Sequence, residues 1–355
     1  MKKIDWDKGF LGIDGRFRSK EKIEKWFLRK IFKYQKQSRH GYKDIIRRRL
    51  GDINVEAKYG LVGSEIINYI ITNLKDILIA SPEKLEIISQ DYKKRINRLK
   101  VQLKRIGSAE TIKDFNKKIL DAFNYSGYRT SLLPLLASKL NIKCCPYCNM
   151  HYTLVVPTGG REKTSKMIAE FQFDHFFSKS EFPLLSMSLY NLIPACANCN
   201  FLKSDTRLSL DFHPYHSDLD SKFKFEIAKD ELNLIMMKEP SDKLIVRLVA
   251  KASNDKNRIK NYADKLNIEA NYSRHRDIVE QINEGIYLES YYNESLNFIN
   301  LGIRSTELRE QGLRKQLLLG GTTDREEIGA YPLSKFRHDI YEFLKHAPLT
   351  SPRNP

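Results

Sequence analysis

The sequence predicts an α+β fold in which a mostly helical chain surrounds a small, metal-stapled core of strands. Long segments on both sides of the centre carry apolar residues at helical spacing, whereas residues 144–216 hold short β-rich segments separated by turns. This central segment also contains two Cys-x-x-Cys pairs, whose spacing is typical of a zinc site. With 355 residues, 41% of them hydrophobic, the chain can form two ordinary domains or one domain with a large insertion.

Residues 1–140 are predicted to form a basic helical domain. One helix is expected over residues 18–37, where Ile23, Phe27 and Ile31 share a face. A second is expected to start after Ser64, as its N-cap, and to stop near Pro82. Further helices are expected over roughly 82–106, 109–125 and 129–140, and basic residues fill their outer faces.

Residues 141–216 are predicted to form a separate core, and residues 217–355 a mixed, mainly helical C-terminal region. In the core, the β-rich segments HYTLVVP and EFQFDHFF flank the loop TGGREKTSK, which indicates a hairpin. A helix is expected to start at Ala197 or Asn198. In the C-terminal region we expect strands in KFKFEIA and KLIVRLVA, helices over 255–300 and 304–318, and an amphipathic helix in LSKFRHDIYEFLKH.

The net charge of +17 is concentrated near the N-terminal side of the chain. Residues 1–140 hold 32 Lys and Arg against 16 Asp and Glu, residues 141–216 hold 7 against 6, and residues 217–355 hold 22 against 22. Localised positive charge attracts polyanions, with nucleic acid as the first candidate. The alternative interpretation of these basic faces is a well-solvated helical surface.

The sequence contains no segment typical of secretion or of membrane insertion. The start, MKKIDWDKGF, has charge but no apolar run behind it, so we expect no signal peptide. The most apolar segment, EIINYIITNLKDILIA, is interrupted by Asn, Lys and Asp, so we expect no transmembrane helix. We therefore expect a soluble protein of the cytoplasm, where five cysteines are not a disulfide set.

Four of the cysteines form two pairs, Cys145 with Cys148 and Cys196 with Cys199, and 47 residues separate the pairs. Two intervening residues let a tight turn aim both thiolates at one Zn²⁺, and two such turns complete a tetrahedron. Zinc held by four protein sulfurs has no open position, so this metal is predicted to be structural. Cys144 could replace Cys145, and His151 is an alternative ligand.

The loop between the two pairs collects polar residues suited to a reaction centre. Asp174 and His175 are adjacent in FQFDHFF, Asn191 lies in the next apolar segment, and Asn200 directly follows the last cysteine. Lys203 is one helical turn beyond Asn200, on the same side of the expected helix. Strand, strand and helix would form a compact cation site, because the zinc staple brings these segments within reach of one another.

This order of residues, DH, then NL, then C-x-x-C-N-x-x-K, resembles the HNH, or ββα-metal, endonucleases of the zinc-stapled type. The resemblance covers roughly residues 144–216. It extends in particular to the HNH subunits that accompany an ATPase in anti-phage systems, such as the PtuB component of Septu. The phrases DFHPYHSDL and PLSKFRHDIYEFL are similar to segments of that group, whereas the basic N-terminal region matches nothing that can be placed.

The resemblance implies a metal-dependent endonuclease, most readily one that cleaves DNA and leaves 5′-phosphate and 3′-hydroxyl ends. Asp174 and Asn200 would hold Mg²⁺ or Mn²⁺, which prefer oxygen ligands, and His175 would deprotonate the attacking water. Asn191 would position His175 and its loop, and Lys203 could contact a substrate phosphate. Many members of the family carry His where this chain has Asn200, which shifts the expected metal preference toward Mg²⁺.

Each of these residues also has a structural interpretation. The Asp174–His175 pair could be a hydrogen-bonded pair at a strand end, Asn200 a helix cap, and Asn191 a turn residue. His213 and His216 flank Pro214-Tyr215 and could be further ligands or part of a structured turn. The alternative function is a zinc-stapled nucleic-acid-binding or adaptor subunit that does not cleave. The expected partners are nucleic acid, most readily DNA, and an ATPase subunit.

Overall fold

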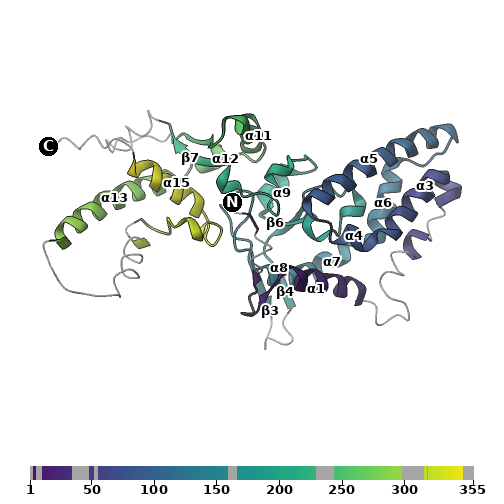
Figure 1. Cartoon of the computed structure of the whole chain (residues 1–355), viewed down its shortest axis with the longest axis horizontal. Coiled ribbons are helices and arrows are strands. Elements are labelled where there is room, and N and C mark those ends of the chain that lie inside the picture. Colours follow the sequence, from purple (N-terminus) through teal and green to yellow (C-terminus); the bar gives the residue numbers. More distant parts are fainter. Residues whose placement is uncertain are drawn as a thin grey trace. The chain divides into compact units, whose positions relative to one another are not determined.

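The computed structural model describes residues 3–4, 10–33, 48–51, 55–158, 166–228, 244–297, 316–317 and 319–346 (Figure 1). These residues belong to two compact units. The helical unit comprises Lys3–Ile142 and Thr153–Ser217, and the C-terminal unit comprises Lys143–Tyr152 and the chain from Asp218 onward. The three-part division predicted from the sequence, with boundaries at 140 and 216, stays a prediction.

The fold is α+β and mostly helical, as predicted at that level. Its described strands pair into four two-stranded antiparallel sheets. None of the helices that the structure describes combines the length and the hydropathy that a membrane span requires.

Helices dominate the helical unit. After a short hairpin of β1 (Phe10–Leu11) and β2 (Phe17–Arg18), its helices are α1 (Lys20–Lys33), α3 (Val55–Thr72), α4 (Leu74–Leu78), α5 (Pro82–Arg105), α6 (Ile112–Phe123), α7 (Tyr125–Ser131) and α8 (Leu133–Leu140). Several starts follow from local chemistry. Ser81 caps α5 by accepting a hydrogen bond from the Lys84 N–H, and Thr111 and Asp114 form a reciprocal capping box at the start of α6.

The predicted helix start at Ser64 is wrong, because α3 already runs through that residue. The helix contains a kink at Gly60, whose φ of 64° lies in the left-handed region that glycine tolerates. Just beyond the kink, the Val62 N–H donates to Oε1 of Gln102 on α5 at 2.8 Å. A side chain distant in sequence therefore satisfies this N–H, and no local N-cap is needed.

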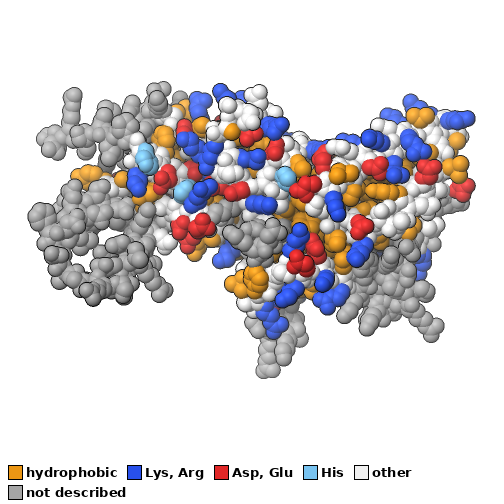
Figure 2. Space-filling view, in the orientation of Figure 1, with side chains coloured by type: hydrophobic (Ala, Val, Ile, Leu, Met, Phe, Trp, Pro, Cys, Tyr) orange, Lys and Arg blue, Asp and Glu red, His pale blue; other side chains and the backbone are white. Residues whose placement is uncertain are grey.

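The apolar stripes predicted for these helices form the core of the unit. Fully buried side chains include Ile66, Ile70, Leu74, Ile77, Leu85, Tyr92 and Leu99. The outer face of α5 exposes Lys93, Lys94, Arg98, Lys100, Lys104 and Arg105. Figure 2 shows Lys and Arg side chains among acidic ones over this part of the chain. The basic residues are thus on the surface, as their helical spacing predicts.

Two further hairpins and a helix complete the helical unit. β3 (Val155–Thr158) pairs with β4 (Lys166–Ala169), and β5 (Gln172–His175) pairs with β6 (Leu192–Ala195). α9 (Ala197–Lys203) follows β6 and begins where the sequence predicts. The hairpin predicted around TGGREKTSK is therefore present, but its second strand is β4. The segment with Asp174 and His175 pairs with β6 instead, because the chain bends at Glu170 and Phe171 between β4 and β5.

The C-terminal unit contains the two strands predicted in it. These are β7 (Phe223–Ile227) and β8 (Val246–Ala250), and the described helices are α11 (Lys256–Lys265), α12 (Ile268–Tyr272), α13 (Arg276–Asn297) and α15 (Ser334–Lys345). Most of the helix predicted over 304–318 lies outside the described residues. Residues 143–152 are anchored here, since the hydroxyls of Tyr262 and Tyr272 donate to the carbonyls of Tyr147 and Cys148.

A buried ion-pair network lies inside the C-terminal unit. The ammonium group of Lys335 is fully buried and donates to Oδ1 of Asp220 at 2.8 Å and to Oδ2 of Asp339 at 2.7 Å. Asp220 also accepts from the Arg325 guanidinium at 2.7 Å. Every charge is paired, as burial of charged groups requires.

Candidate active site and metal centre

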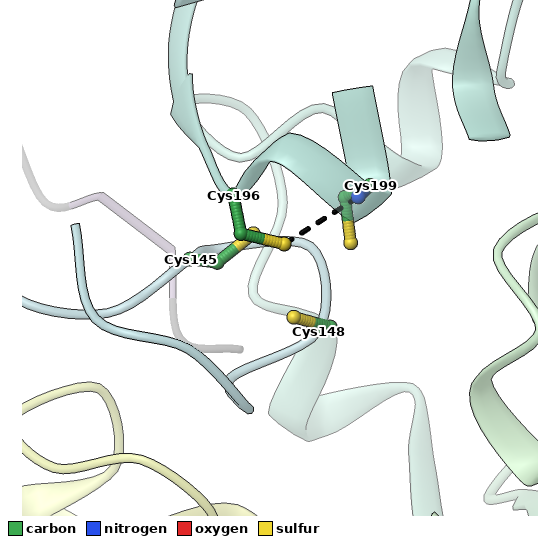
Figure 3. A group of neighbouring side chains, drawn as sticks. All are labelled: Cys145, Cys148, Cys196 and Cys199. Atoms are coloured by element: carbon green, nitrogen blue, oxygen red, sulfur yellow. Dashed lines mark hydrogen bonds between the residues drawn. The ribbon is translucent and has the colours of Figure 1, made fainter. Parts of the chain in front are cut away.

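The two Cys-x-x-Cys pairs meet, as their spacing predicts. The sulfurs of Cys145, Cys148, Cys196 and Cys199 all lie within 4.8 Å of one another, and all four residues are buried. Figure 3 shows the four sulfurs pointing toward a common centre, with Cys196 and Cys199 at the start of α9 and the other two on a loop. Tetrahedral Zn²⁺ with bonds of about 2.3 Å to sulfur separates the sulfurs by about 3.8 Å. The four thiols fit that ion after a small contraction, so they could bind zinc.

Backbone N–H groups stabilise the two turns, here called knuckles, that the Cys-x-x-Cys pairs form. The Cys199 N–H donates to Sγ of Cys196, and the Met150 N–H donates to Sγ of Cys148, each at 3.4 Å. Donors that face sulfur stabilise the charged form in which cysteine binds metal. Cys196 is also the N-cap of α9, so the second knuckle and the helix start are one feature.

The alternative ligands considered for this centre, Cys144 and His151, are not members of the group. Cys144 instead forms a β-bridge with Tyr152, and burial raises the pKa of its thiol to about 12. His151 has an exposed side chain, and its carbonyl accepts a hydrogen bond from the Cys145 N–H at 2.9 Å. Burial therefore keeps the fifth cysteine a neutral thiol.

β5, β6 and α9 bring the other predicted residues together. Asp174 and His175 are the last two residues of β5, where they pair in register with Ile193 and Leu192 of β6. The strand–strand–helix order predicted from the sequence is thus present.

Two side-chain contacts connect β5 to α9. Nζ of Lys203 donates to Oδ1 of Asp174 at 3.1 Å, and Nδ2 of Asn200 donates to Oε1 of Gln172. Residues 172 and 174 share one face of the strand, and residues 200 and 203 share one face of the helix. Two side chains from one face of β5 therefore meet two side chains from one face of α9, and these two contacts hold the strand end against the helix.

Lys203 is fully buried, with a second hydrogen bond from Nζ to the carbonyl of His175 at 2.8 Å. The sequence suggested a contact with a substrate phosphate for this residue. In the structure its ammonium group instead has two protein acceptors, and both belong to the candidate site.

His175 lies at the end of β5 with its ring 4.5 Å from that of Tyr125, in an edge-on arrangement. Its Nε2 is 3.0 Å from the carbonyl oxygen of Ser186. Because a carbonyl can only accept, Nε2 carries the proton in the neutral ring and Nδ1 holds the lone pair. Burial, followed by the charge of Lys179, lowers the pKa of His175 to about 3. The imidazole is therefore neutral near pH 7, with Nδ1 unprotonated.

Asn191 is fully buried and holds the segment between β5 and β6 in place. Its Oδ1 accepts from the Phe177 N–H at 2.7 Å. Its Nδ2 donates to the carbonyls of Phe177 and Leu185 at 3.0 and 2.9 Å. Three hydrogen bonds from one amide fix the loop that also presents the Ser186 carbonyl to His175.

A pocket of about 310 Å³ lies over these elements, entirely within the helical unit. Of the residues singled out in the sequence, Asp174, His175 and Asn200 line it, whereas Asn191 and Lys203 do not. Asp174, Asn200 and His175 thus border one solvent-accessible space. Carboxylate and amide oxygens are the donors that Mg²⁺ and Mn²⁺ accept, with water completing the coordination, so this donor set fits such an ion.

Sequence reasoning missed the rest of the lining. The other residues around the pocket are Tyr125, Arg129, Gln172, Phe173, Ser178, Lys179, Phe201, Ser204 and Asp205. Tyr125 and Arg129 come from α7, far from the motif in sequence, and no local pattern marks them. Lys179 lies four residues after His175, and this closeness to the motif was the only feature of the sequence that could have marked it as a lining residue.

His213 and His216 do not line this pocket. His213 is fully buried, its ring packs 4.2 Å from that of Phe176, and its Nδ1 accepts from the Tyr215 N–H at 3.2 Å. His216 pairs with Glu83 at 2.6 Å. Both histidines therefore have structural contacts, which fits the structured-turn interpretation of this segment.

Comparison of the chain with known protein families, with curated proteins and with solved structures found no match.

Proposed function

We propose that this chain is a metal-dependent endonuclease of the HNH type that hydrolyses phosphodiester bonds of DNA. One observation carries the proposal: Asp174, His175 and Asn200, from β5 and α9, line a single pocket. They are the residues that the sequence motif assigns to metal binding and proton transfer. The same pocket also contains the cations Arg129 and Lys179, which suit a phosphate-bearing substrate.

The residues divide the chemistry as follows. Asp174 and Asn200 would hold one Mg²⁺ or Mn²⁺, which, when bound, neutralises charge that develops on the scissile phosphate. His175 would take the proton of the attacking water at Nδ1, because its Nε2 proton is engaged with the Ser186 carbonyl. The ring is in the neutral form that a base requires near pH 7, and its lowered pKa makes it a weaker base than a free histidine.

The four cysteines would bind Zn²⁺ with no open coordination position, so this ion has a structural role in the proposal. Cys196 and Cys199 lie in the first turn of α9, directly before Asn200. Zinc would therefore fix the helix start that presents Asn200 to the pocket.

DNA as the substrate and an ATPase as the partner of an anti-phage system remain part of the proposal. The excess of Lys and Arg in residues 1–140 supports a polyanionic substrate. The ATPase partner rests on the sequence resemblance of the motif alone.

The test is incubation of purified chain with supercoiled plasmid and Mg²⁺, with and without an ATPase encoded beside it. Nicking by the wild type, together with loss of nicking in a folded, zinc-loaded Asp174→Ala variant, would support the proposal. No nicking under either condition, with plasmid binding retained, would favour the non-cleaving nucleic-acid-binding module.

A further inference from the structure

Two cations that no motif assigns face the candidate active site. Arg129 is exposed on α7, and Lys179 is half-buried in the loop after β5. Both line the pocket that also contains Asp174 and His175. The chain thus places two positive side chains from separate elements at one small space.

The position of Lys179 is fixed by its neighbours. Its ammonium group lies 4.6 Å from the centre of the Tyr125 ring, an arrangement that favours a cation over an aromatic face. Burial, followed by the charge of Arg129, lowers the pKa of Lys179, so the two cations are close enough to repel each other. Their proximity has an unfavourable energy that an anion between them would relieve.

The two carboxylates of the pocket are already engaged with other groups. Asp205 lies near Lys179, and its Oδ1 accepts a hydrogen bond from the Ser178 hydroxyl. Asp174 accepts from the buried ammonium group of Lys203. Two cations, Arg129 and Lys179, thus share the pocket with two carboxylates, and one of these, Asp174, is already neutralised by Lys203 from outside the lining.

We propose that Arg129 and Lys179 form a subsite for an internal phosphodiester of a nucleic-acid strand, next to Asp174 and His175. A guanidinium binds phosphate oxygens through two parallel N–H bonds, and an ammonium group adds a point charge. The proposal rests on the proposed function for the identity of the strand. Phe201, which is 80% exposed and also lines the pocket, offers an aromatic ring on which a base of that strand would stack.

The subsite is tested by binding, separately from cleavage. The parent is the full chain with His175→Ala, and the wild type without added divalent cation serves as a second parent. Fluorescence anisotropy measures the affinity for a labelled oligonucleotide, single-stranded and duplex, at several salt concentrations. Arg129→Ala and Lys179→Ala are compared with Arg258→Ala and Lys256→Ala, which remove the same charges from the exposed face of α11, in the charge-balanced C-terminal part of the chain. Zinc content and thermal unfolding confirm that each variant is folded.

Each pocket variant is expected to weaken binding about tenfold or more, the size expected for loss of a charge-assisted hydrogen bond. Each should also reduce the slope of log affinity against log salt by about 1. The α11 controls should change affinity by about twofold at most. Pocket variants that bind no more weakly than these controls, or parents that bind no oligonucleotide, would overturn the subsite.

Competition distinguishes a strand phosphate from a free one. Inorganic phosphate and a nucleoside monophosphate should displace the oligonucleotide only at concentrations far above its own dissociation constant. Equal affinity for the monophosphate would instead identify a nucleotide pocket and contradict the proposal. If the wild type nicks plasmid but both pocket variants bind the oligonucleotide normally, the subsite proposal is wrong and the nuclease proposal stands. If the pocket variants lose binding but the wild type never cleaves, the nuclease proposal is wrong and the subsite proposal stands.

Discussion

The ammonium group of Lys203 lies 3.1 Å from Oδ1 of Asp174, and both side chains are almost completely excluded from solvent. Burying two charges costs several kcal/mol each, which their attraction offsets only in good geometry with further hydrogen bonds. The His175 carbonyl supplies one such bond to Lys203 at 2.8 Å. The ion pair therefore fixes the end of β5 against α9, and it holds the carboxylate proposed to bind the catalytic cation.

Replacement of Lys203 by Met should leave the Asp174 carboxylate buried without its counter-charge. We expect a loss of about 3 kcal/mol in the free energy of unfolding and a fall of about 6–12 °C in the melting temperature. Mn²⁺ should restore more stability to this variant than it adds to the wild type, because the ion would replace the missing positive charge. Thermal melts with and without MnCl₂ measure both effects.

The matched control is the double variant Lys203→Met with Asp174→Asn, which removes the uncompensated charge. It should recover part of the lost stability and show no response to Mn²⁺. A single variant as stable as the wild type, or a double variant with the same Mn²⁺ response, would show that Asp174 does not depend on a positive neighbour.

Cys144 and Cys148 lie four residues apart, and the account predicts different effects on zinc content when each is replaced. Cys148→Ser should lose the metal and destabilise the protein strongly, since structural zinc contributes folding free energy directly. Cys144→Ser should retain one zinc ion per chain, because Cys144 is outside the four-sulfur group. Metal analysis of the purified variants measures this difference. Equal zinc loss in both variants would mean that the ligand set is not the one described.

Buried neutral histidines predict a specific pH dependence of stability. Burial, followed by the charge of His216, lowers the pKa of His213 from 6.5 to about 3. As pH falls below 6.5, the unfolded chain takes up a proton that the folded chain refuses until about pH 3, so stability declines. Each such histidine contributes a slope of up to about 1.4 kcal/mol per pH unit.

His213→Gln should flatten the decline between pH 6.5 and 4.5 by about this slope, and the part of the decline that comes from His175 should remain. Urea unfolding at several pH values gives the free energy of unfolding directly. An unchanged slope in His213→Gln would show that His213 takes up its proton at the same pH in the folded and the unfolded chain, which contradicts the lowered pKa.

Local patterns were sufficient for much of the fold. The start of α5 follows from Ser81 and Pro82, and the start of α9 from its place beside Cys196. The spacing of the two cysteine pairs was sufficient to predict that their four sulfurs meet at one site, because Cys-x-x-Cys pairs are typical of zinc sites. These features depend on residues within a few positions of one another.

Features that depend on packing between distant segments could not be obtained in this way. Arg129 and Tyr125 face the pocket only because α7 packs near β5, which no spacing in the sequence reveals. Helical periodicity placed Lys203 correctly beside Asn200. Whether its ammonium group meets a substrate or Asp174 depends on the pleat and pairing of β5, which only the fold determines.

The most direct test of the nuclease account compares two buried histidines in one plasmid-nicking assay. His175 lines the pocket, whereas His213 has a similarly lowered pKa and lies outside that lining. With zinc content and folding verified for each, His175→Ala should lose about 100-fold or more of the Mg²⁺-dependent rate. His213→Ala should keep a rate close to that of the wild type. Nicking by His175→Ala at the wild-type rate would contradict the assignment of His175 as the base, and with it the account of this site.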